Sequence, residues 1–380
     1  MPTTGAYLVI GAIAAMVTFI TTPIVARVAR RMGWVVEPDD RRVHKVATPD
    51  VGGIAMFAGF IVAFAASRLS DRFDPLFARN SEPRGVLIAA SLMFLVGLVD
   101  DIRELSAPAK VAGTVVVGWV LVTFGVTMFY FRVPFMGVIV LSDDWIPLVT
   151  VIWLLVMTQA INLIDGLDGL AAGIVAIGAG AFYLYSQRLR ELGFLSEPNI
   201  GSLVAIITVG ICLGFLPHNF NPARIFMGDG GALLLGLLMA VSTSVVGGRA
   251  DPVAQAFPGQ TYFFLAPLFI PLIILGVPIV DTAFAIVRRV SRRQGWATAD
   301  KGHLHHRLMD LGHGQRRSVL ILWAWTGLLS AFVLYPVLTG SGVSYVPIGG
   351  AMLVLLLFTV LHPQIRRNRP ATDRHDISEG

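Results

Sequence analysis

Charged residues and cysteine are both scarce in this chain of 380 residues. Only 14% of its residues are charged, whereas 55% are hydrophobic, and the mean hydropathy is +0.73. This balance excludes an ordinary soluble domain and is typical of a membrane protein. Cys212 is the only cysteine and lies inside an apolar run, which excludes an internal disulfide and a zinc site built on cysteines.

Apolar runs long enough to cross a bilayer recur along the whole chain. A helix needs about 20 residues to cross about 30 Å of hydrocarbon. The sequence predicts an all-α, polytopic protein with one transmembrane catalytic domain over residues 1–368 and a disordered polar tail over 369–380. Eleven spans are expected, near residues 5–25, 51–67, 85–99, 111–130, 147–163, 170–186, 199–216, 231–247, 263–284, 318–338 and 344–361.

The distribution of Lys and Arg predicts the orientation of these spans, because basic residues accumulate in short cytoplasmic loops. With the N-terminus outside, the predicted inner segments contain 21 of the 29 Lys and Arg residues. This asymmetry favours an inner-membrane protein with an outer N-terminus and a cytoplasmic C-terminus. The first span is expected to be retained, because Arg27, Arg30 and Arg31 follow it and no basic segment precedes it.

The predicted spans themselves lack charge, with Asp281 as the exception. Ion-coupled transporters usually place charged groups near the membrane midplane, so a transporter is disfavoured. The histidines and the carboxylates with polar neighbours fall instead on predicted inner loops. Four of these loops are rich in polar residues: DDIRELSAPAK, NLIDGLDGL, HNFNPARIFMGDGG and RRVSRRQGWATADKGHLHHRL. The pattern indicates an enzyme whose spans hold one site at the inner face.

Two adjacent carboxylates, Asp100 and Asp101, lie where the third span ends, and Lys110 follows. The end of a helix already carries partial negative charge, so two acids there are unfavourable unless a cation or a hydrogen-bond donor offsets them. One interpretation is a pair of solvated acids that ends the span. The other is a site for Mg²⁺ or a substrate proton, with Lys110 close by for phosphate. Successive helical residues point about 100° apart, which predicts different roles for the two acids.

Asn162, Asp165 and Asp168 follow the fifth span at a spacing of three residues. They share one face if the helix continues through them, whereas Gly166 and Gly169 favour a broken helix. Either geometry brings oxygen-bearing side chains together, although capping alone is the alternative. Hard oxygen ligands suit Mg²⁺, which usually takes one or two protein carboxylates and completes its shell with water and phosphate.

The loop after the seventh span contains His218, Asn219 and Arg224 and ends at Asp229 within a glycine-rich turn. An acid at this position is either an ordinary favourable residue of a helix N-terminus or a metal ligand beside a phosphate-binding turn. The nearby arginine and the flanking glycines favour the second interpretation.

The long basic loop after the ninth span contains three histidines within four residues. Arginines next to a membrane are often only topological or lipid-facing, which is one interpretation of this loop. The histidines favour contacts with phosphate and sugar, and zinc is the less favoured alternative because no cysteine accompanies them. The residues concerned are Lys301, His303, His305, His306 and Arg307.

Taken together, these motifs resemble the polyprenyl-phosphate N-acetylhexosamine-1-phosphate transferase superfamily. The resemblance begins at the sequence RRVHKVATPDVGG over residues 41–53 and extends through the histidine loop. Within the superfamily, GVPIVDTAFAIVRR over 276–289 and DKGHLHHRL over 300–308 resemble the branch that uses UDP-N-acetylglucosamine. The sequence departs from the family at Thr114 and Gln159, where Gln and Asn are common, but both residues here remain polar.

The resemblance implies an Mg²⁺-dependent enzyme, with Mn²⁺ as a partial substitute, in which polyprenyl phosphate attacks the β-phosphorus of UDP-N-acetylglucosamine and UMP is released. By motif, Asp100, Asp101 and Asp229 look like catalytic residues, and the metal candidates are Asp229, Asp100 and Asp165. The implied substrate contacts are His44, Lys110, Asn162, Asp165, Asp168, His218, Asn219, Arg224, Lys301, His303, His305, His306 and Arg307. The expected partners are the two substrates and the bilayer; nucleic acid is not expected, and a homodimer is left open.

Another polytopic class, the CDP-alcohol phosphotransferases, is disfavoured by its own motif. That motif requires Ala-Arg shortly after Asp-Gly, whereas Leu-Asp-Gly-Leu follows Asp165 and Gly166 here. The sequence therefore predicts a sugar-1-phosphate transferase that starts the assembly of a cell-envelope polysaccharide.

Overall fold

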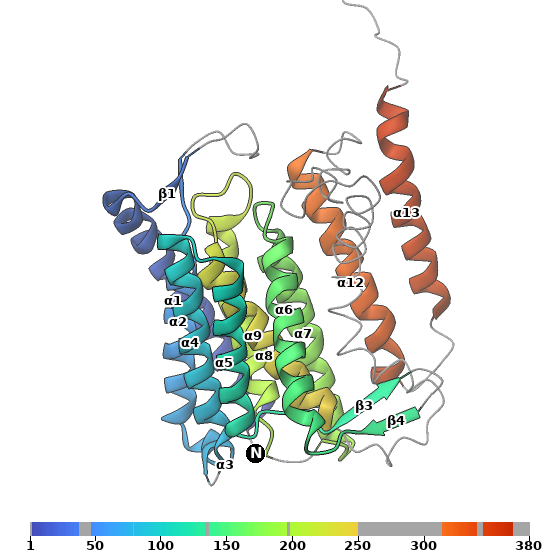
Figure 1. Ribbon diagram of the computed structural model, residues 1–380. Coiled ribbons are helices and arrows are strands. Elements are labelled where there is room, and N and C mark those ends of the chain that lie inside the picture. The colour runs from blue at the N-terminus through green and yellow to red at the C-terminus, as the bar shows by residue number, and fades with distance from the viewer. Residues whose placement is uncertain are drawn as a thin grey trace, which may run out of the picture.

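The computed structural model of the chain is mostly helical (Figure 1). It describes residues 2–37, 47–78, 80–133, 137–195, 198–249, 314–339 and 345–367. Helices overlap ten of the eleven predicted spans, and the span predicted at 263–284 lies outside the described residues.

The long helices are α1 (Thr4–Met32), α2 (Gly53–Arg68), α4 (Glu82–Arg103), α5 (Ala107–Thr123), α6 (Trp145–Ile164), α7 (Leu170–Glu191), α8 (Gly201–Asn219), α9 (Gly228–Val246), α12 (Gln315–Thr339) and α13 (Tyr345–Arg367). Three short helices, η1 (Asp71–Phe73), α3 (Asp74–Phe77) and η2 (Gly247–Arg249), join them. Two small antiparallel hairpins pair β1 (Val35–Val36) with β2 (Thr48–Pro49) and β3 (Tyr130–Val133) with β4 (Gly137–Val140). In the second hairpin, Tyr130 lies opposite Val140.

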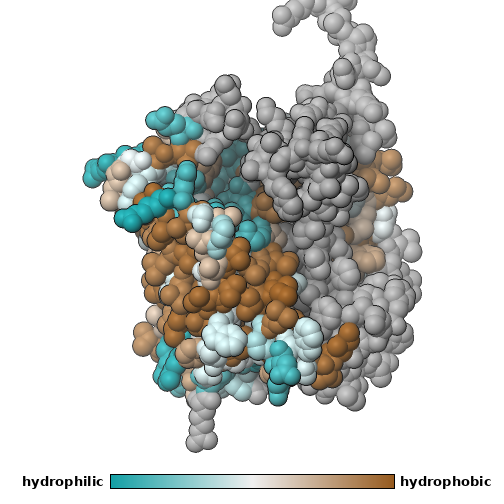
Figure 2. All heavy atoms as spheres, viewed as in Figure 1, coloured by the Kyte–Doolittle hydropathy of each residue, from teal (hydrophilic) through white to brown (hydrophobic). Residues whose placement is uncertain are grey.

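Six of the described helices are long and apolar enough to cross a bilayer, namely α1, α4, α6, α7, α8 and α9 extended to Arg249. A seventh span is obtained if α2 and the segment Asp71–Phe77, which are bent by 85° relative to each other, count as one. On the face shown in Figure 2, an apolar band crosses the described surface, with hydrophilic residues above and below it. The chain is therefore a multi-pass membrane protein, whereas the count of eleven spans and the orientation stay predictions.

Local sequence accounts for several helix ends. The Thr3 hydroxyl accepts a hydrogen bond from the Ala6 amide at 3.3 Å and so caps the start of α1. Gly33 ends the same helix with a φ of 75°, which is a left-handed conformation that glycine adopts readily. Gly169 has a φ of 79° immediately before α7, so the chain turns sharply between α6 and α7.

Helix α9 lies at the centre of the bundle, where it packs against α2, α4, α6 and α8. Within its apolar window 94% of the residues are buried, compared with 28% for α1 at the edge. Small residues let membrane helices approach closely. A Cβ atom on Gly214 of α8 would lie 2.2 Å from the carbonyl oxygen of Ala15 in α1, so this contact requires glycine.

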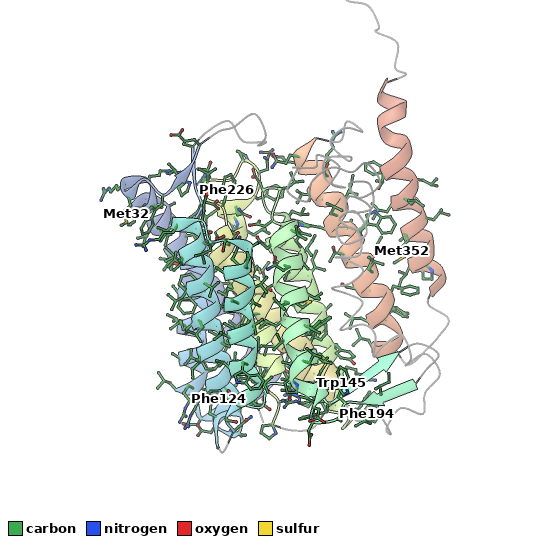
Figure 3. The ribbon with its side chains drawn as sticks, viewed as in Figure 1. Met32, Phe124, Trp145, Phe194, Phe226 and Met352 are labelled. Atoms are coloured by element: carbon green, nitrogen blue, oxygen red, sulfur yellow. The ribbon has the colours of Figure 1, made fainter. Side chains whose placement is uncertain are left out.

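The helices alternate in direction, so each end of the bundle collects a separate set of loops (Figure 1). We call the end where α4 and α6 finish and α9 begins the carboxylate end, because Asp100, Asp165 and Asp229 lie there. The opposite end is where α4 begins and α9 finishes. Figure 3 places Met32 and Phe226 at the carboxylate end and Phe124, Trp145 and Phe194 at the opposite end.

Candidate active site at the carboxylate end

The segment that precedes α2 pairs with the segment that precedes α9. Phe226 donates its amide hydrogen to the carbonyl oxygen of Pro49 at 2.8 Å, and its own carbonyl accepts from Gly52 at 2.9 Å. Gly53 donates to the carbonyl of Met227 at 2.8 Å. These bonds place Asp50 beside the N-terminus of α9.

Asp50 is a site residue that sequence reasoning missed. It lies within the motif over residues 41–53, but nothing in its local pattern distinguished it from a loop acid. In the structure a Cβ atom on Gly228 would lie 2.5 Å from the Asp50 carbonyl oxygen. Asp50 is also close enough to raise the pKa of Asp165 by repulsion. The contacts that identify it come from distant residues, so no local sequence signal could have found it.

Asp101 holds the first turn of α9 in place. One oxygen of its carboxylate accepts from the Asp229 amide at 2.6 Å, and the other accepts from the Gly230 amide at 3.1 Å. Helices α4 and α9 approach each other closely here, because a Cβ atom on Gly97 of α4 would lie 2.5 Å from the carbonyl oxygen of Asp229 in α9. An acid is favourable at a helix N-terminus, where amide groups lack partners.

Asp100 lies next to Asp101 on α4 but has different partners. Its carboxylate accepts from the Nζ of Lys110 at 2.8 Å and from the Leu105 amide at 2.6 Å. The same Nζ lies 2.9 Å from a carboxylate oxygen of Asp229. The three side chains are between 11% and 24% exposed, so solvent still reaches them. Lys110 thus bridges Asp100 of α4 and Asp229 of α9, and we call this arrangement the lysine bridge.

The helix of the fifth predicted span, α6, does not continue through Asp165 and Asp168. Of the two geometries that the spacing allowed, the structure has the broken helix. Helix α6 ends at Ile164, and the Asp165 amide donates to the Asn162 carbonyl at 3.3 Å. Burial, together with the charges of Asp50, Asp229 and Asp168, raises the pKa of Asp165 to about 8. The three other carboxylates are therefore close enough to Asp165 to disfavour its charged form.

Asn219 and Asp168 join neighbouring loops of the site. The buried Asn219 side chain accepts from the Gly169 amide at 2.9 Å and donates to the Ile225 carbonyl at 3.0 Å. A carboxylate oxygen of Asp168 accepts from the Ala223 amide at 3.0 Å. Both predicted substrate contacts thus already bond to main-chain groups, which makes them supports of the loops around the carboxylates.

The structure places His218 and Arg224 away from the lysine bridge. The Nε2 atom of His218 lies 3.0 Å from the Phe19 carbonyl oxygen, and the two rings lie 4.8 Å apart, so His218 packs on α1. Arg224 is exposed, and its carbonyl accepts from the guanidinium of Arg30 at 3.2 Å. The remaining predicted contacts, His44, Lys301, His303, His305, His306 and Arg307, lie outside the described residues.

The donor set at this end fits a divalent cation that is completed by other ligands. Among the residues that the structure describes, no three His, Cys, Asp or Glu side chains are arranged to hold a metal ion on their own. Mg²⁺ usually takes only one or two protein carboxylates, and substrate phosphate and water fill its remaining positions. Asp165 and Asp229 supply carboxylate oxygens near each other, since the charge of Asp229 is one of the causes, after burial, that raise the pKa of Asp165. Asp165 and Asp229 therefore fit such an ion.

The sequence is similar to those of known glycosyl transferases. The sequence model of glycosyl transferase family 4 matches residues 84–247, the range from α4 to α9 that contains the lysine bridge. Decaprenyl-phosphate N-acetylglucosaminephosphotransferase of Mycobacterium tuberculosis is 38% identical over 329 residues, which cover 84% of this chain and 80% of that protein.

Two further relatives represent two named activities. A Bacillus subtilis protein named "Probable undecaprenyl-phosphate N-acetylglucosaminyl 1-phosphate transferase" is 36% identical over 310 residues, covering 81% of this chain and 78% of that protein. A phospho-N-acetylmuramoyl-pentapeptide-transferase of Desulforudis audaxviator is 32% identical over 361 residues, covering 88% of this chain and 99% of that protein.

Proposed function

The chain belongs to the polyprenyl-phosphate N-acetylhexosamine-1-phosphate transferases of glycosyl transferase family 4, and from this premise we propose that it transfers N-acetylglucosamine-1-phosphate from UDP-N-acetylglucosamine to polyprenyl phosphate. The products are polyprenyl-pyrophosphoryl-N-acetylglucosamine and UMP. This is the initiating membrane step in the assembly of a cell-envelope polysaccharide. The observation that carries the proposal is the bridge from Asp100 through Lys110 to Asp229, with Asp165 nearby.

The proposed chemistry is a single in-line displacement. An oxygen of the lipid phosphate forms a bond to the β-phosphorus, and the bond from that phosphorus to the oxygen shared with the α-phosphate breaks, so UMP leaves with that oxygen. A phosphomonoester has a second pKa of about 6, so the attacking group is largely anionic at neutral pH. Phosphoryl transfer then depends mainly on positioning and on neutralising charge.

Each residue of the bridge has a proposed role. Asp100 orients the lipid phosphate or takes its remaining proton, because it lies in the last turn of α4 and its carboxylate, 11% exposed, is still reached by solvent. Lys110 supplies positive charge to a phosphate oxygen. Asp101 positions Asp229 by holding the start of α9. Asp229 and Asp165 would hold Mg²⁺, with Asp100 as a third candidate ligand. When bound, the ion would neutralise charge on the pyrophosphate of the donor.

We propose that the carboxylate end faces the cytoplasm in an inner membrane, with eleven spans and the N-terminus outside. The excess of Lys and Arg in the segments that the sequence predicts to be cytoplasmic supports the orientation. UDP-sugars are cytoplasmic metabolites, which is consistent with a donor site on that side.

A transfer assay with purified protein tests the proposal. The protein in detergent or nanodiscs is incubated with Mg²⁺, a polyprenyl phosphate and radiolabelled UDP-N-acetylglucosamine, and the lipid pyrophosphate and UMP are quantified. Parallel reactions contain UDP-N-acetylmuramoyl-pentapeptide, the donor type of the other relative. We expect equal amounts of the two products from the first donor only. Transfer from the second donor alone, or no UMP from either donor, would contradict the proposal.

A further inference from the structure

A polar network joins the start of α12 to the loops of the candidate site. Figure 1 shows that α12 begins at the carboxylate end, where α8 finishes and α9 begins. Asn221 lies in the loop between those two helices. Its side-chain amide donates to Asp168 at 2.9 Å and to the Oε1 of Gln315 at 2.7 Å. Both hydrogens of the amide are therefore used.

The neighbouring residue of α12 holds the other side of Asn221. The Nε of Arg316 donates to the Asn221 main-chain carbonyl at 2.9 Å and to its side-chain oxygen at 3.3 Å. Only one orientation of the Asn221 amide satisfies all of these groups, with nitrogen toward the two acceptors and oxygen toward the guanidinium. The network thus specifies how Asn221 meets the Asp168 carboxylate.

Helix α12 is itself seated firmly against the site. The indole of Trp323 occupies the space above Gly173 of α7, because a Cβ atom there would lie 2.0 Å from the ring. The same ring lies 5.6 Å from that of Phe220, which directly precedes Asn221. Ser318 and Val319, within the first two turns of α12, are fully buried. The position of Gln315 is therefore fixed by packing and not only by its own hydrogen bond.

From this geometry we propose that Gln315 and Arg316 are positioning residues for the transfer reaction, which hold the Asp168 carboxylate in place through Asn221. The proposal rests on the proposed function, in which Asp165, three residues before Asp168, would hold the cation at the pyrophosphate of the donor. Asp168 also accepts from the Ala223 amide, so the same network fixes the loop that leads to α9. Neither Gln315 nor Arg316 touches the lysine bridge in the contacts of the described residues, so their effect should be on donor binding.

Kinetics of four variants test the proposal. Gln315→Met keeps the size of the side chain but removes the acceptor, whereas Gln315→Glu keeps an oxygen at the same position. We expect Gln315→Met to raise the KM for UDP-N-acetylglucosamine about fivefold, the effect of losing one hydrogen bond in a charged network. The KM of Gln315→Met for polyprenyl phosphate should stay near the wild-type value. The separate variant Gln315→Glu should keep most of the wild-type affinity for the donor. Arg316→Ala should resemble Gln315→Met, whereas Arg317→Ala, an exposed arginine one residue further, is the matched control.

A second measurement separates this proposal from the proposed function. Hydrogen exchange by mass spectrometry is run on each variant and on the wild-type protein without substrate. Gln315→Met and Arg316→Ala should speed exchange in the peptides that contain 165–169 and 221–224, and Arg317→Ala should not. If the wild-type protein transfers no sugar but these changes occur, the proposed function fails and the network stands.

Three results would overturn the proposal. One is an unchanged donor KM in Gln315→Met, and another is an equal defect in Gln315→Met and Gln315→Glu, which would indicate packing alone. The third is exchange in the two loop peptides that matches the wild-type protein in both Gln315→Met and Arg316→Ala. If Gln315→Met does not fold, Arg316→Ala decides the question by itself, because that side chain is exposed and leaves no cavity.

Discussion

Helices α4 and α9 carry an ion-paired cluster at each end, and the two clusters differ in their balance of charge. At the carboxylate end, Asp100 of α4 and Asp229 of α9 share the single cation of Lys110. At the opposite end, Glu82 begins α4 and pairs with Arg249, which follows α9. One cluster has two acids for one cation, and the other has one acid for one cation.

The surroundings of Arg249 show what a structural cluster looks like in this fold. Its guanidinium donates to Glu82, to the carbonyl of Gly125 and, at 3.0 Å, to the carbonyl of Thr127. The group also lies 5.1 Å from the centre of the Phe129 ring. Each guanidinium nitrogen is therefore bonded to a group of the fold, so this cluster ties α4, α9 and the segment after α5 together.

The carboxylate end has further acids besides the two that Lys110 bridges. Asp50, Asp165 and Asp168 lie there as well, and burial together with the charges of Asp50, Asp229 and Asp168 raises the pKa of Asp165. From this contrast we propose that substrate binding and chemistry take place at the carboxylate end, and that the pair at the opposite end holds the helices together.

The largest effect is expected for Asp229→Asn, which removes a charge and leaves the shape. We predict a loss of transfer activity of about a thousandfold, because a principal contact to the cation and the charge that Lys110 pairs with both disappear. The melting temperature should stay near that of the wild-type protein. The measurement is the rate at saturating Mg²⁺ together with a thermal melt. A variant that keeps most of its rate would return Asp229 to ordinary helix capping.

Arg249→Met should lower the stability of the fold and leave the transfer rate nearly unchanged. Removing one partner of a buried pair leaves the charge of Glu82 uncompensated, and one oxygen of that carboxylate already lacks a hydrogen bond in the described structure. We predict a loss of about 3 kcal/mol in the free energy of unfolding, seen as a lower melting temperature. The rate per folded molecule should change little, since the pair lies at the far end of α4. A selective loss of rate with an unchanged melt would erase the contrast between the two ends.

Asp100→Asn and Asp101→Asn should each have a smaller effect than Asp229→Asn, and they should affect different kinetic quantities. Asp100→Asn should lower kcat at saturating Mg²⁺ by about tenfold or more, because Asp100 is proposed to act on the lipid phosphate. Asp101→Asn should mainly raise the Mg²⁺ concentration needed for half-maximal rate, because Asp101 only positions Asp229. Initial rates over a Mg²⁺ series measure both quantities. Equal defects with an unchanged Mg²⁺ dependence in both variants would defeat this division.

Accessibility in cells tests the comparison without disturbing activity. Ala107→Cys lies exposed at the carboxylate end and Asp143→Cys lies exposed at the opposite end, while the native Cys212 is buried. An impermeant thiol reagent should label Asp143→Cys in intact cells and Ala107→Cys only after the inner membrane is opened. Labelling of Ala107→Cys in intact cells would reverse the proposed orientation.

Much of the fold could be predicted because membrane spans are local features of sequence. Apolar runs such as 5–25 and 199–216 became α1 and α8 with little ambiguity. The predicted boundary of the first span was too short, since α1 continues to Met32 beyond its apolar run. Helical hydrogen bonding continues into polar sequence, which hydropathy alone does not detect.

The partners within the site could not be predicted, because they depend on contacts between distant segments. Lys110 and Asp229 are 119 residues apart, and sequence marked each of them without showing that they meet. The sequence grouped His218 with the site, but its ring lies against Phe19 of α1, on a different side of α8. Gln315 gave no signal at all, because a polar residue at the start of a helix is common.

Metal binding directly tests the proposal that the carboxylate end, and not the opposite end, binds a divalent cation. Mn²⁺ binding to the purified protein can be followed by electron paramagnetic resonance, with wild-type protein, Asp229→Asn and Arg249→Lys compared at equal concentration. We expect about one Mn²⁺ per wild-type chain, retained in Arg249→Lys and lost or strongly weakened in Asp229→Asn. Undiminished binding in Asp229→Asn, or loss of binding in Arg249→Lys with the fold intact, would contradict the proposal.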